Sequence, residues 1–158
     1  MNDRRMFLGL AGAAAGSLLL FGRSTAAVPG NFAVNRTPAQ WLQILGPERY
    51  HILREAGTER AFTSPLLNEH RQGVFLCAGC GLPLFSSATK FESGTGWPSF
   101  WQALPRATVS RGRRDLFFGT EMLCSRCGGH LGHVFNDGPK PTGLRYCIDG
   151  LALKFVPA

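Results

Sequence analysis

Two matched pairs of cysteines constrain the fold of this chain more than any other feature. Cys77 and Cys80 form one C-x-x-C knuckle, and Cys124 and Cys127 form a second. Glycine follows each pair directly and permits the tight turn that points both sulfurs of a knuckle toward one centre. Two such turns complete a tetrahedral Cys₄ site, so we expect one Zn²⁺ held by all four cysteines. The long segment between the knuckles must fold so that the two pairs meet.

Two other uses of these cysteines stay open at the level of the sequence. In an exported protein the same pattern is consistent with two disulfides, or with one redox-active C-x-x-C pair. Zinc is favoured because two similar, glycine-trailed knuckles fit one tetrahedron better than two unrelated redox pairs.

The beginning of the chain has the composition of a targeting segment. Arg4 and Arg5 precede an uncharged run over residues 6–22, and small residues suited to a signal peptidase follow at 24–27. The run is shorter and less apolar than the ~20 residues of a membrane span, so no permanent span is expected. The pattern resembles a twin-arginine export signal, with an uncleaved anchor as the alternative.

We therefore expect three segments: a signal peptide over 1–26, a linker over 27–36 and one domain over 37–158. The predicted location is outside the cytoplasm, in the periplasm. A twin-arginine route carries folded proteins, so a metal can be loaded in the reducing cytoplasm before export. This route favours zinc over disulfides at the four paired cysteines.

The excess of positive charge does not indicate a nucleic-acid partner. The chain has 17 Lys+Arg and 10 Asp+Glu, a net charge of +7. Residues 1–26 contain three of the basic residues and one acidic residue, so the remainder carries +5. Its one basic cluster, residues 111–114, is short and has no interleaved aromatic residues. We interpret this cluster as a solvated loop and expect no nucleic-acid binding.

The pattern of the remaining chain predicts short helices followed by a small antiparallel β domain. Thr37 and Pro38 fit an N-cap and the first helical position, and Gly46 can end that helix. Pro47 can open a second helix that stops at Gly57. Beyond residue 60 short apolar runs alternate with turn clusters, a pattern typical of strands. A hydrophobic fraction of 44% with 17% charged residues excludes wholesale disorder.

The fifth cysteine, Cys147, is a candidate nucleophile. It lies in an alternating segment that predicts a strand, with Arg145 and Asp149 on the same face. The guanidinium of Arg145 lowers the pKa of a nearby thiol, whereas the carboxylate of Asp149 opposes this effect. A buried structural thiol is the alternative interpretation of an isolated cysteine.

Other chemically capable side chains precede Cys147 in the sequence. His130, His133 and Asp137 lie in one short segment, and the imidazoles could donate protons to a reacting oxygen near neutral pH. The rival interpretation, a metal bound by H-x-x-H, lacks a third ligand at a familiar spacing. Trp97, flanked by glycine and proline, is the best candidate for the wall of a pocket.

Five segments together resemble the B-type methionine sulfoxide reductases, which reduce the R epimer of methionine sulfoxide. The resemblance covers approximately Thr37 to Phe155. It is carried, in order, by Cys77-Ala78-Gly79-Cys80-Gly81, Phe91-Glu92-Ser93-Gly94-Thr95-Gly96-Trp97-Pro98-Ser99-Phe100, Cys124-Ser125-Arg126-Cys127, His130-Leu131-Gly132-His133-Val134-Phe135 and Arg145-Tyr146-Cys147.

The resemblance implies a mainly β fold, in which two antiparallel sheets form a small tent-like domain. It also implies that the zinc of the Cys₄ site has a structural role. It implies that Cys147 attacks the sulfoxide sulfur and becomes a sulfenic acid, the first and reversible step of cysteine oxidation. The resemblance implies that His130, His133 and Asp137 help to bind or protonate the oxygen. It implies that Arg145 lowers the pKa of the Cys147 thiol and that Trp97 and Phe135 contact the substrate. The expected substrates are oxidised proteins or peptides, and the expected reductant is a thioredoxin-like protein or a small thiol.

Two positions depart from the family pattern. Many members have a resolving cysteine where this chain has Thr95, so a sulfenic acid at Cys147 needs an outside thiol or a zinc ligand for its reduction. Asp149 stands where the family usually has asparagine.

Two other classes of protein remain as alternatives: an inert zinc-ribbon-like binding module and a C-x-x-C thiol–disulfide oxidoreductase. The first predicts no turnover of methionine sulfoxide. The second predicts redox cycling of a knuckle and little zinc.

Overall fold

The computed structural model describes residues 31–115 and 119–158. The predicted signal peptide, and residues 27–30 of the predicted linker, lie outside these residues. The order of the elements along the chain is α1 (Pro38–Glu55), η1 (Pro65–Asn68), β1 (Gly73–Cys77), β2 (Pro83–Ser86), η2 (Ser87–Thr89), β3 (Lys90–Phe91), β4 (Ser99–Phe100), β5 (Thr108–Asp115), β6 (Gly119–Cys124), β7 (His130–Phe135), β8 (Arg145–Ile148), η3 (Gly150–Ala152) and β9 (Leu153–Pro157). Within the described residues, no helix has both the length and the apolar character of a membrane span.

The N-terminal helical region begins and breaks at the residues that the sequence indicated. Thr37 is the N-cap and exchanges two hydrogen bonds with Gln40, a capping box. Gly46 has φ +70°, a left-handed value that interrupts the helix, and Pro47 follows as the helix resumes. The predicted stop at Gly57 is wrong by one residue, because Ala56 adopts the left-handed C-cap conformation instead.

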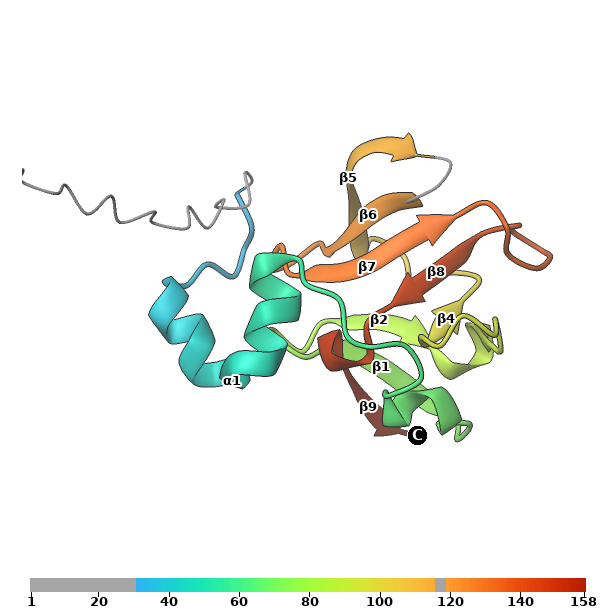
Figure 1. Ribbon diagram of the computed structural model, residues 1–158, viewed down its shortest axis with the longest axis horizontal. Helices are drawn as coiled ribbons and strands as arrows, with labels where there is room; N and C mark the ends of the chain where they lie inside the picture. The colour runs from blue at the N-terminus through green and yellow to red at the C-terminus, as the bar shows by residue number, and fades with distance from the viewer. Residues whose placement is uncertain (1–30, 116–118) are drawn as a thin grey trace, which may run out of the picture.

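The strands form two antiparallel sheets, as predicted (Figure 1). The smaller sheet has the order β2-β1-β9, so the C-terminal strand pairs with the first strand. The larger has the order β3-β4-β8-β7-β6-β5. Thus β8 lies inside the larger sheet, with β4 on one side and β7 on the other. Its residues are fixed by hydrogen bonds along both edges.

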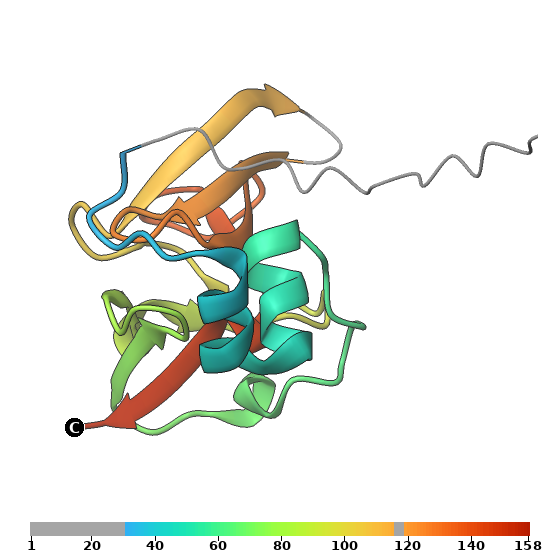
Figure 2. The ribbon, with the colours of Figure 1, turned by 90° about the vertical axis from the view of Figure 1, so that its left-hand side faces the viewer.

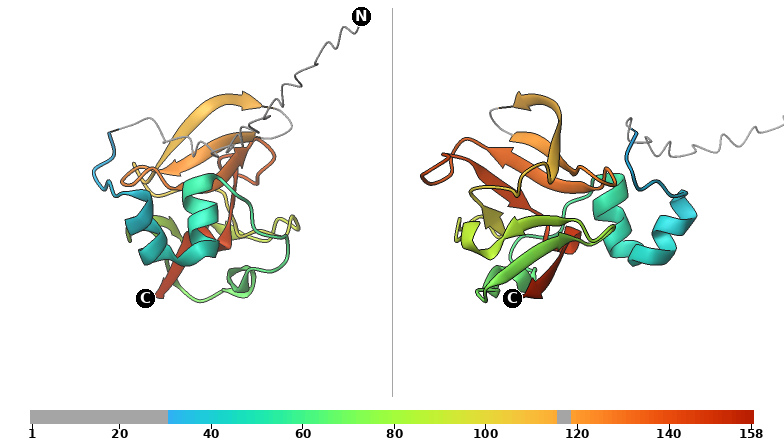
Figure 3. Two further views of the ribbon diagram at one scale, coloured as in Figure 1. Left: turned by 60° about the vertical axis from the view of Figure 1, so that its left-hand side comes forward. Right: turned by 180° about the vertical axis from the view of Figure 1, so that it is seen from behind.

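The core lies between the two sheets and under α1. Phe85 of β2 stacks on Phe100 of β4 with ring centroids 4.4 Å apart, and Phe75 of β1 meets the same ring edge-on at 4.9 Å. Both contacts join the smaller sheet to the larger one. Figures 2 and 3 show α1 against one end of the two sheets, where Ile52 and Leu53 are buried. Burial of these apolar side chains holds the sheets in a fixed relative position.

The basic cluster at 111–114 is not the solvated loop that the sequence suggested. It forms part of strand β5, which pairs with β6. The guanidinium of Arg111 makes two hydrogen bonds with the carboxylate of Glu121, at 2.6 and 2.7 Å. The cluster forms a strand because a charged residue on one strand of a hairpin can pair with an opposite charge on the neighbouring strand.

Candidate active site and metal centre

The two cysteine knuckles occupy equivalent turns of the two sheets. Cys77 ends β1 and Cys80 lies in the turn before β2, whereas Cys124 ends β6 and Cys127 lies in the turn before β7. Each turn closes with the glycine N–H donating to the carbonyl of the first cysteine at 2.8 Å. The four cysteines therefore lie where a hairpin of the smaller sheet meets a hairpin of the larger one.

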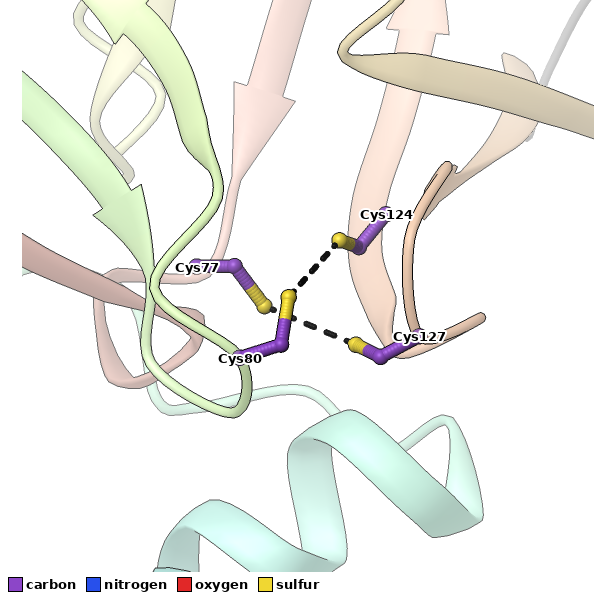
Figure 4. A group of neighbouring side chains, drawn as sticks. All are labelled: Cys77, Cys80, Cys124 and Cys127. Carbon is purple, nitrogen blue, oxygen red and sulfur yellow. Dashed lines mark hydrogen bonds between the residues drawn. The ribbon is translucent and has the colours of Figure 1, made fainter. Parts of the chain in front are cut away.

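The four sulfurs converge from both sides on one centre (Figure 4). All four lie within 4.8 Å of one another, with 3.7 Å between Cys77 and Cys127 and 3.5 Å between Cys80 and Cys124. A tetrahedral metal with sulfur ligands at ~2.3 Å places sulfurs about 3.8 Å apart, so these distances fit such an ion. The cysteines are free thiols and form no disulfide among the described residues. They can hold one metal ion.

Helix α1 packs against the knuckle that lies between β6 and β7. The guanidinium of Arg54 donates to the carbonyl of Cys127 at 3.0 Å, and the same group lies 4.7 Å above the ring of Trp41. Because Trp41 is buried, this end of the helix is fixed to the metal centre through one cation and one backbone oxygen.

Cys147 lies in the interior of the larger sheet, away from these turns. On β8 it pairs with Ser99 of β4 on one side and with His133 of β7 on the other. Its Sγ is 3.7 Å from Oγ1 of Thr95, which belongs to the loop between β3 and β4. The fifth cysteine is thus a half-buried thiol held by two neighbouring strands and one loop.

A cavity of about 160 Å³ opens beside the Cys147 thiol. Four residues that the sequence indicated as site residues line it: Trp97, His133, Phe135 and Cys147. Three further lining residues were not assigned to a pocket from the sequence: Thr58, Gly132 and Asp149. Two aromatic rings, one imidazole and one thiol in a small space can hold a group with an apolar part and a single polar atom.

Gly132 makes this close arrangement of β7 and β8 feasible. Its φ is +140°, and a Cβ at this position would lie 2.1 Å from the carbonyl oxygen of Cys147. No real side chain tolerates such a contact, so glycine is required where His133 and Cys147 face each other.

The thiol of Cys147 is tuned by opposing effects. Burial raises its pKa and is the largest influence, and the negative charge of Asp149 acts in the same direction. Hydrogen bonds from Thr95 and Arg145, together with the positive charge of Arg145, lower the pKa. The sequence predicted the separate effects of Arg145 and Asp149 correctly, but the resulting pKa is raised because burial outweighs the guanidinium.

Arg145 is held in place by Asp137 and Phe135. Two hydrogen bonds at 2.9 and 2.7 Å join its guanidinium to the Asp137 carboxylate, and its charged carbon lies 4.3 Å from the centre of the Phe135 ring. Asp137 is exposed and does not line the cavity. Its contact with the site therefore runs through Arg145, while Phe135 reaches both Arg145 and the cavity.

The two histidines occupy different layers of the site. His133 is on the cavity wall, whereas His130 is buried behind it with the two rings 5.4 Å apart. Nδ1 of His130 lies 2.8 Å from the Glu121 carboxylate. Burial lowers the pKa of both imidazoles, so both are predominantly neutral at neutral pH.

Glu59 is a part of the site that the sequence did not reveal. Its buried carboxylate accepts the N–H groups of Gly150 and Leu151, at 2.5 and 3.0 Å. Its own N–H donates to Asp149, and its carbonyl accepts the indole N–H of Trp97 at 3.2 Å. One residue thus positions a wall of the cavity and the turn after β8. No local motif marks Glu59, because its partners are separated from it along the chain.

Comparison with known proteins gives the same family that the sequence motifs resemble. The SelR domain model matches residues 45–157. The peptide methionine sulfoxide reductase MsrB of Leptospira interrogans is 55% identical over 128 residues, covering 79% of this chain and 97% of the relative. This chain is a member of the SelR family. MsrB proteins of Thiobacillus denitrificans (59% identity, 77% of this chain and 94% of the relative) and Agrobacterium fabrum (53%, 78% and 93%) are similarly close. The SelR match includes both knuckles and every residue of the cavity lining.

Proposed function

We propose that this chain reduces the R epimer of methionine sulfoxide, chiefly in oxidised proteins and peptides, with Cys147 as the nucleophile. Membership of the SelR family, with close relatives that are peptide methionine sulfoxide reductases, supports the reaction. The observation that carries the site assignment is the position of Cys147 in a cavity with Trp97, Phe135 and His133. The resemblance to the B-type enzymes supports the R epimer.

Each wall of the cavity has a part in this reaction. Trp97 and Phe135 offer apolar surface to the S-methyl group and the adjoining carbons of the substrate. His133 offers an imidazole nitrogen to the sulfoxide oxygen, and His130 packs against His133. Arg145, held by Asp137, lowers the pKa of Cys147 and favours the nucleophilic thiolate.

The reaction exchanges one oxygen atom between two sulfurs. Sγ of Cys147 attacks the sulfoxide sulfur, the S–O bond of the substrate breaks, and an S–O bond to Cys147 forms. The methionine sulfur gains two electrons and the cysteine sulfur loses two. Methionine leaves, and Cys147 remains as a sulfenic acid.

An outside thiol completes the cycle. Oγ1 of Thr95 is 3.7 Å from the Cys147 sulfur, so a hydroxyl occupies the place that a resolving thiol could take. The other four cysteines converge on the metal centre. The sulfenic acid is therefore reduced by a small thiol or a thioredoxin-like protein, which attacks sulfur from the solvent side.

The metal of the Cys₄ centre is Zn²⁺, one per chain, with a structural role. Four thiolates at tetrahedral spacing are the donor set that zinc prefers, and a closed coordination sphere has no position for substrate. When bound, zinc cross-links the hairpin β1–β2 to the hairpin β6–β7. Cys77, Cys80, Cys124 and Cys127 hold it.

The reductase domain is residues 37–158, preceded by a linker at 27–36 and a twin-arginine signal at 1–26 that directs the chain to the periplasm. Support for the signal is the sequence pattern of Arg4 and Arg5 before an uncharged run.

An assay with separated epimers tests the proposed function. Purified protein is given R or S methionine sulfoxide in a peptide, with dithiothreitol as reductant, and methionine is quantified. Turnover is expected for R alone, and Cys147→Ser is expected to lose it while keeping its circular dichroism spectrum. Turnover by the serine variant would remove Cys147 as the nucleophile. Inactive wild-type protein that contains zinc would favour a binding module, and redox cycling of a knuckle would favour a thiol–disulfide oxidoreductase.

A further inference from the structure

A buried carboxyl group borders the cavity beside Cys147. Asp149 directly follows β8, its side chain is 4% exposed, and it lines the cavity with Cys147 and His133. Oδ1 accepts the N–H of Glu59 at 2.9 Å. Oδ2 faces Nε2 of His130 at 3.8 Å, which is longer than a hydrogen bond.

The protonation of His130 follows from its other neighbour. Arg111 lowers the pKa of Glu121 against the opposing effect of partial burial, so Glu121 is ionised and accepts a hydrogen bond from Nδ1 of His130. Burial keeps the imidazole neutral. The single ring proton is therefore on Nδ1, and Nε2 has a lone pair. In the part of the chain that the structure describes, this buried nitrogen has no hydrogen-bond partner.

A negative charge on Asp149 is unfavourable in this position. An ionised Oδ2 would face the lone pair of His130 Nε2, with the carboxylate of Glu59 also nearby. A proton on Oδ2 removes this repulsion and supplies a donor at the edge of the cavity. Burial raises the pKa of Asp149 to about 7; the hydrogen bond from the Glu59 N–H opposes this shift, and the charge of Glu59 adds to it. A neutral carboxyl group is thus available near neutral pH.

We propose that Asp149 donates the proton that the sulfoxide oxygen needs when Cys147 attacks, a role that rests on the proposed reductase function. Neither histidine offers a proton as readily. The Nδ1 proton of His130 is engaged by Glu121, and burial disfavours the charged, acidic form of His133. Asp149 combines a position on the cavity wall with a transferable proton.

The proton balance closes within the site. Oδ2 of Asp149 gives its proton to the sulfoxide oxygen as the substrate S–O bond breaks, and this proton stays on the new sulfenic acid of Cys147. The proton lost by the Cys147 thiol returns to the Asp149 carboxylate. The two-electron exchange between the sulfurs is unchanged, and no further acid is consumed.

The pH dependence of the chemical step follows from this assignment. The titratable groups around Asp149 are Glu59 from the loop after α1, His130 and His133 from β7, and Cys147 from β8. As the pH rises above about 7, Asp149 loses its proton while the thiolate fraction of Cys147 still increases, because burial raises the pKa of that thiol. The two changes offset each other, so the rate of sulfoxide reduction levels off above about pH 7. A mechanism limited by the Cys147 thiolate alone predicts instead a rate that keeps rising over this range, because the thiolate fraction increases with pH.

Asp149→Asn tests the assignment. Asparagine keeps the shape of the side chain and can accept the Glu59 N–H, but it has no proton to transfer. Single-turnover rates with R sulfoxide are measured from about pH 6 to about pH 9. We expect a loss of about 10²-fold at the acidic end and, in place of the level wild-type rate above neutrality, a rate that rises with pH. Glu92→Gln, the same change at an exposed carboxylate, is the matched control and should keep the wild-type profile.

An unchanged rate and pH profile in Asp149→Asn, in an enzyme that reduces sulfoxide, would overturn the role of Asp149 alone. Absence of turnover in the wild type would instead overturn the proposed function, and this role with it. Infrared difference spectroscopy gives a readout independent of activity. The C=O band of a neutral carboxylic acid should be present in wild type at about pH 6 and missing in Asp149→Asn. Its absence in the wild type would mean that Asp149 is ionised there, and would contradict the proposal.

Discussion

Replacing Thr95 by cysteine should give this chain a resolving thiol. Oγ1 of Thr95 lies 3.7 Å from Sγ of Cys147, and a disulfide needs ~2.05 Å between sulfurs, so a small movement of the loop between β3 and β4 is sufficient. The closed loop spans 52 residues, for which the chain-entropy estimate of the gain in unfolding free energy is about 4 kcal/mol. Strain in the bond would reduce this value.

The assay is one turnover with excess R sulfoxide and no reductant, followed by peptide mapping in the mass spectrometer. Thr95→Cys should contain a disulfide between the introduced cysteine and Cys147, unfold at higher denaturant concentration when oxidised, and accept electrons from thioredoxin more readily than the wild type. Thr95→Ser, which keeps the hydroxyl, should form only the sulfenic acid. Failure of the disulfide to form in an active Thr95→Cys protein would show that this loop does not meet Cys147 as the structure places it.

Three other results are expected. Cys124→Ser should abolish stoichiometric zinc in elemental analysis and lower the free energy of unfolding by more than about 4 kcal/mol, and a metal-free wild type would contradict this. Arg145→Gln should raise the pKa of Cys147 further, because a cation that lowers it is removed, so that thiol alkylation at fixed pH slows by about tenfold; an unchanged alkylation rate would refute the tuning. Changing both Arg4 and Arg5 to lysine should leave unprocessed precursor in the cytoplasm, and normal processing would exclude the twin-arginine route.

Local signals in the sequence were sufficient for the elements that depend on neighbouring residues. The N-cap at Thr37 and the break at Gly46 could both be predicted, because each is decided within one helical turn. The convergence of two knuckles could be predicted because a Cys₄ centre requires it. The C-cap at Ala56 was missed because a non-glycine residue there adopts φ +53°.

The partition into sheets depends on contacts that no local pattern contains. β9 pairs with β1, and β4 with β8, across long separations in the sequence. The alternation of apolar residues shows that a strand exists but not which edge it joins. The two-sheet arrangement therefore came from the family resemblance.

The site shows the same division between local and distant information. Cys147, His133 and Trp97 could be found because their chemistry stands out in the sequence. Glu59 could not, since its function is to hold backbone groups of residues 150 and 151 from far along the chain. The raised pKa of Cys147 was also hidden, because burial is a property of the folded chain.

The most direct test of the account is a single-turnover measurement without any reductant. Wild-type protein is mixed with excess R sulfoxide, methionine is quantified, and the cysteines are trapped with a sulfenic-acid reagent and mapped by mass spectrometry. We expect methionine in a one-to-one ratio to protein, the trapped adduct at Cys147, and no Cys147 disulfide. A disulfide between Cys147 and a knuckle cysteine would contradict the account, because a residue assigned to the metal would then be the resolving thiol.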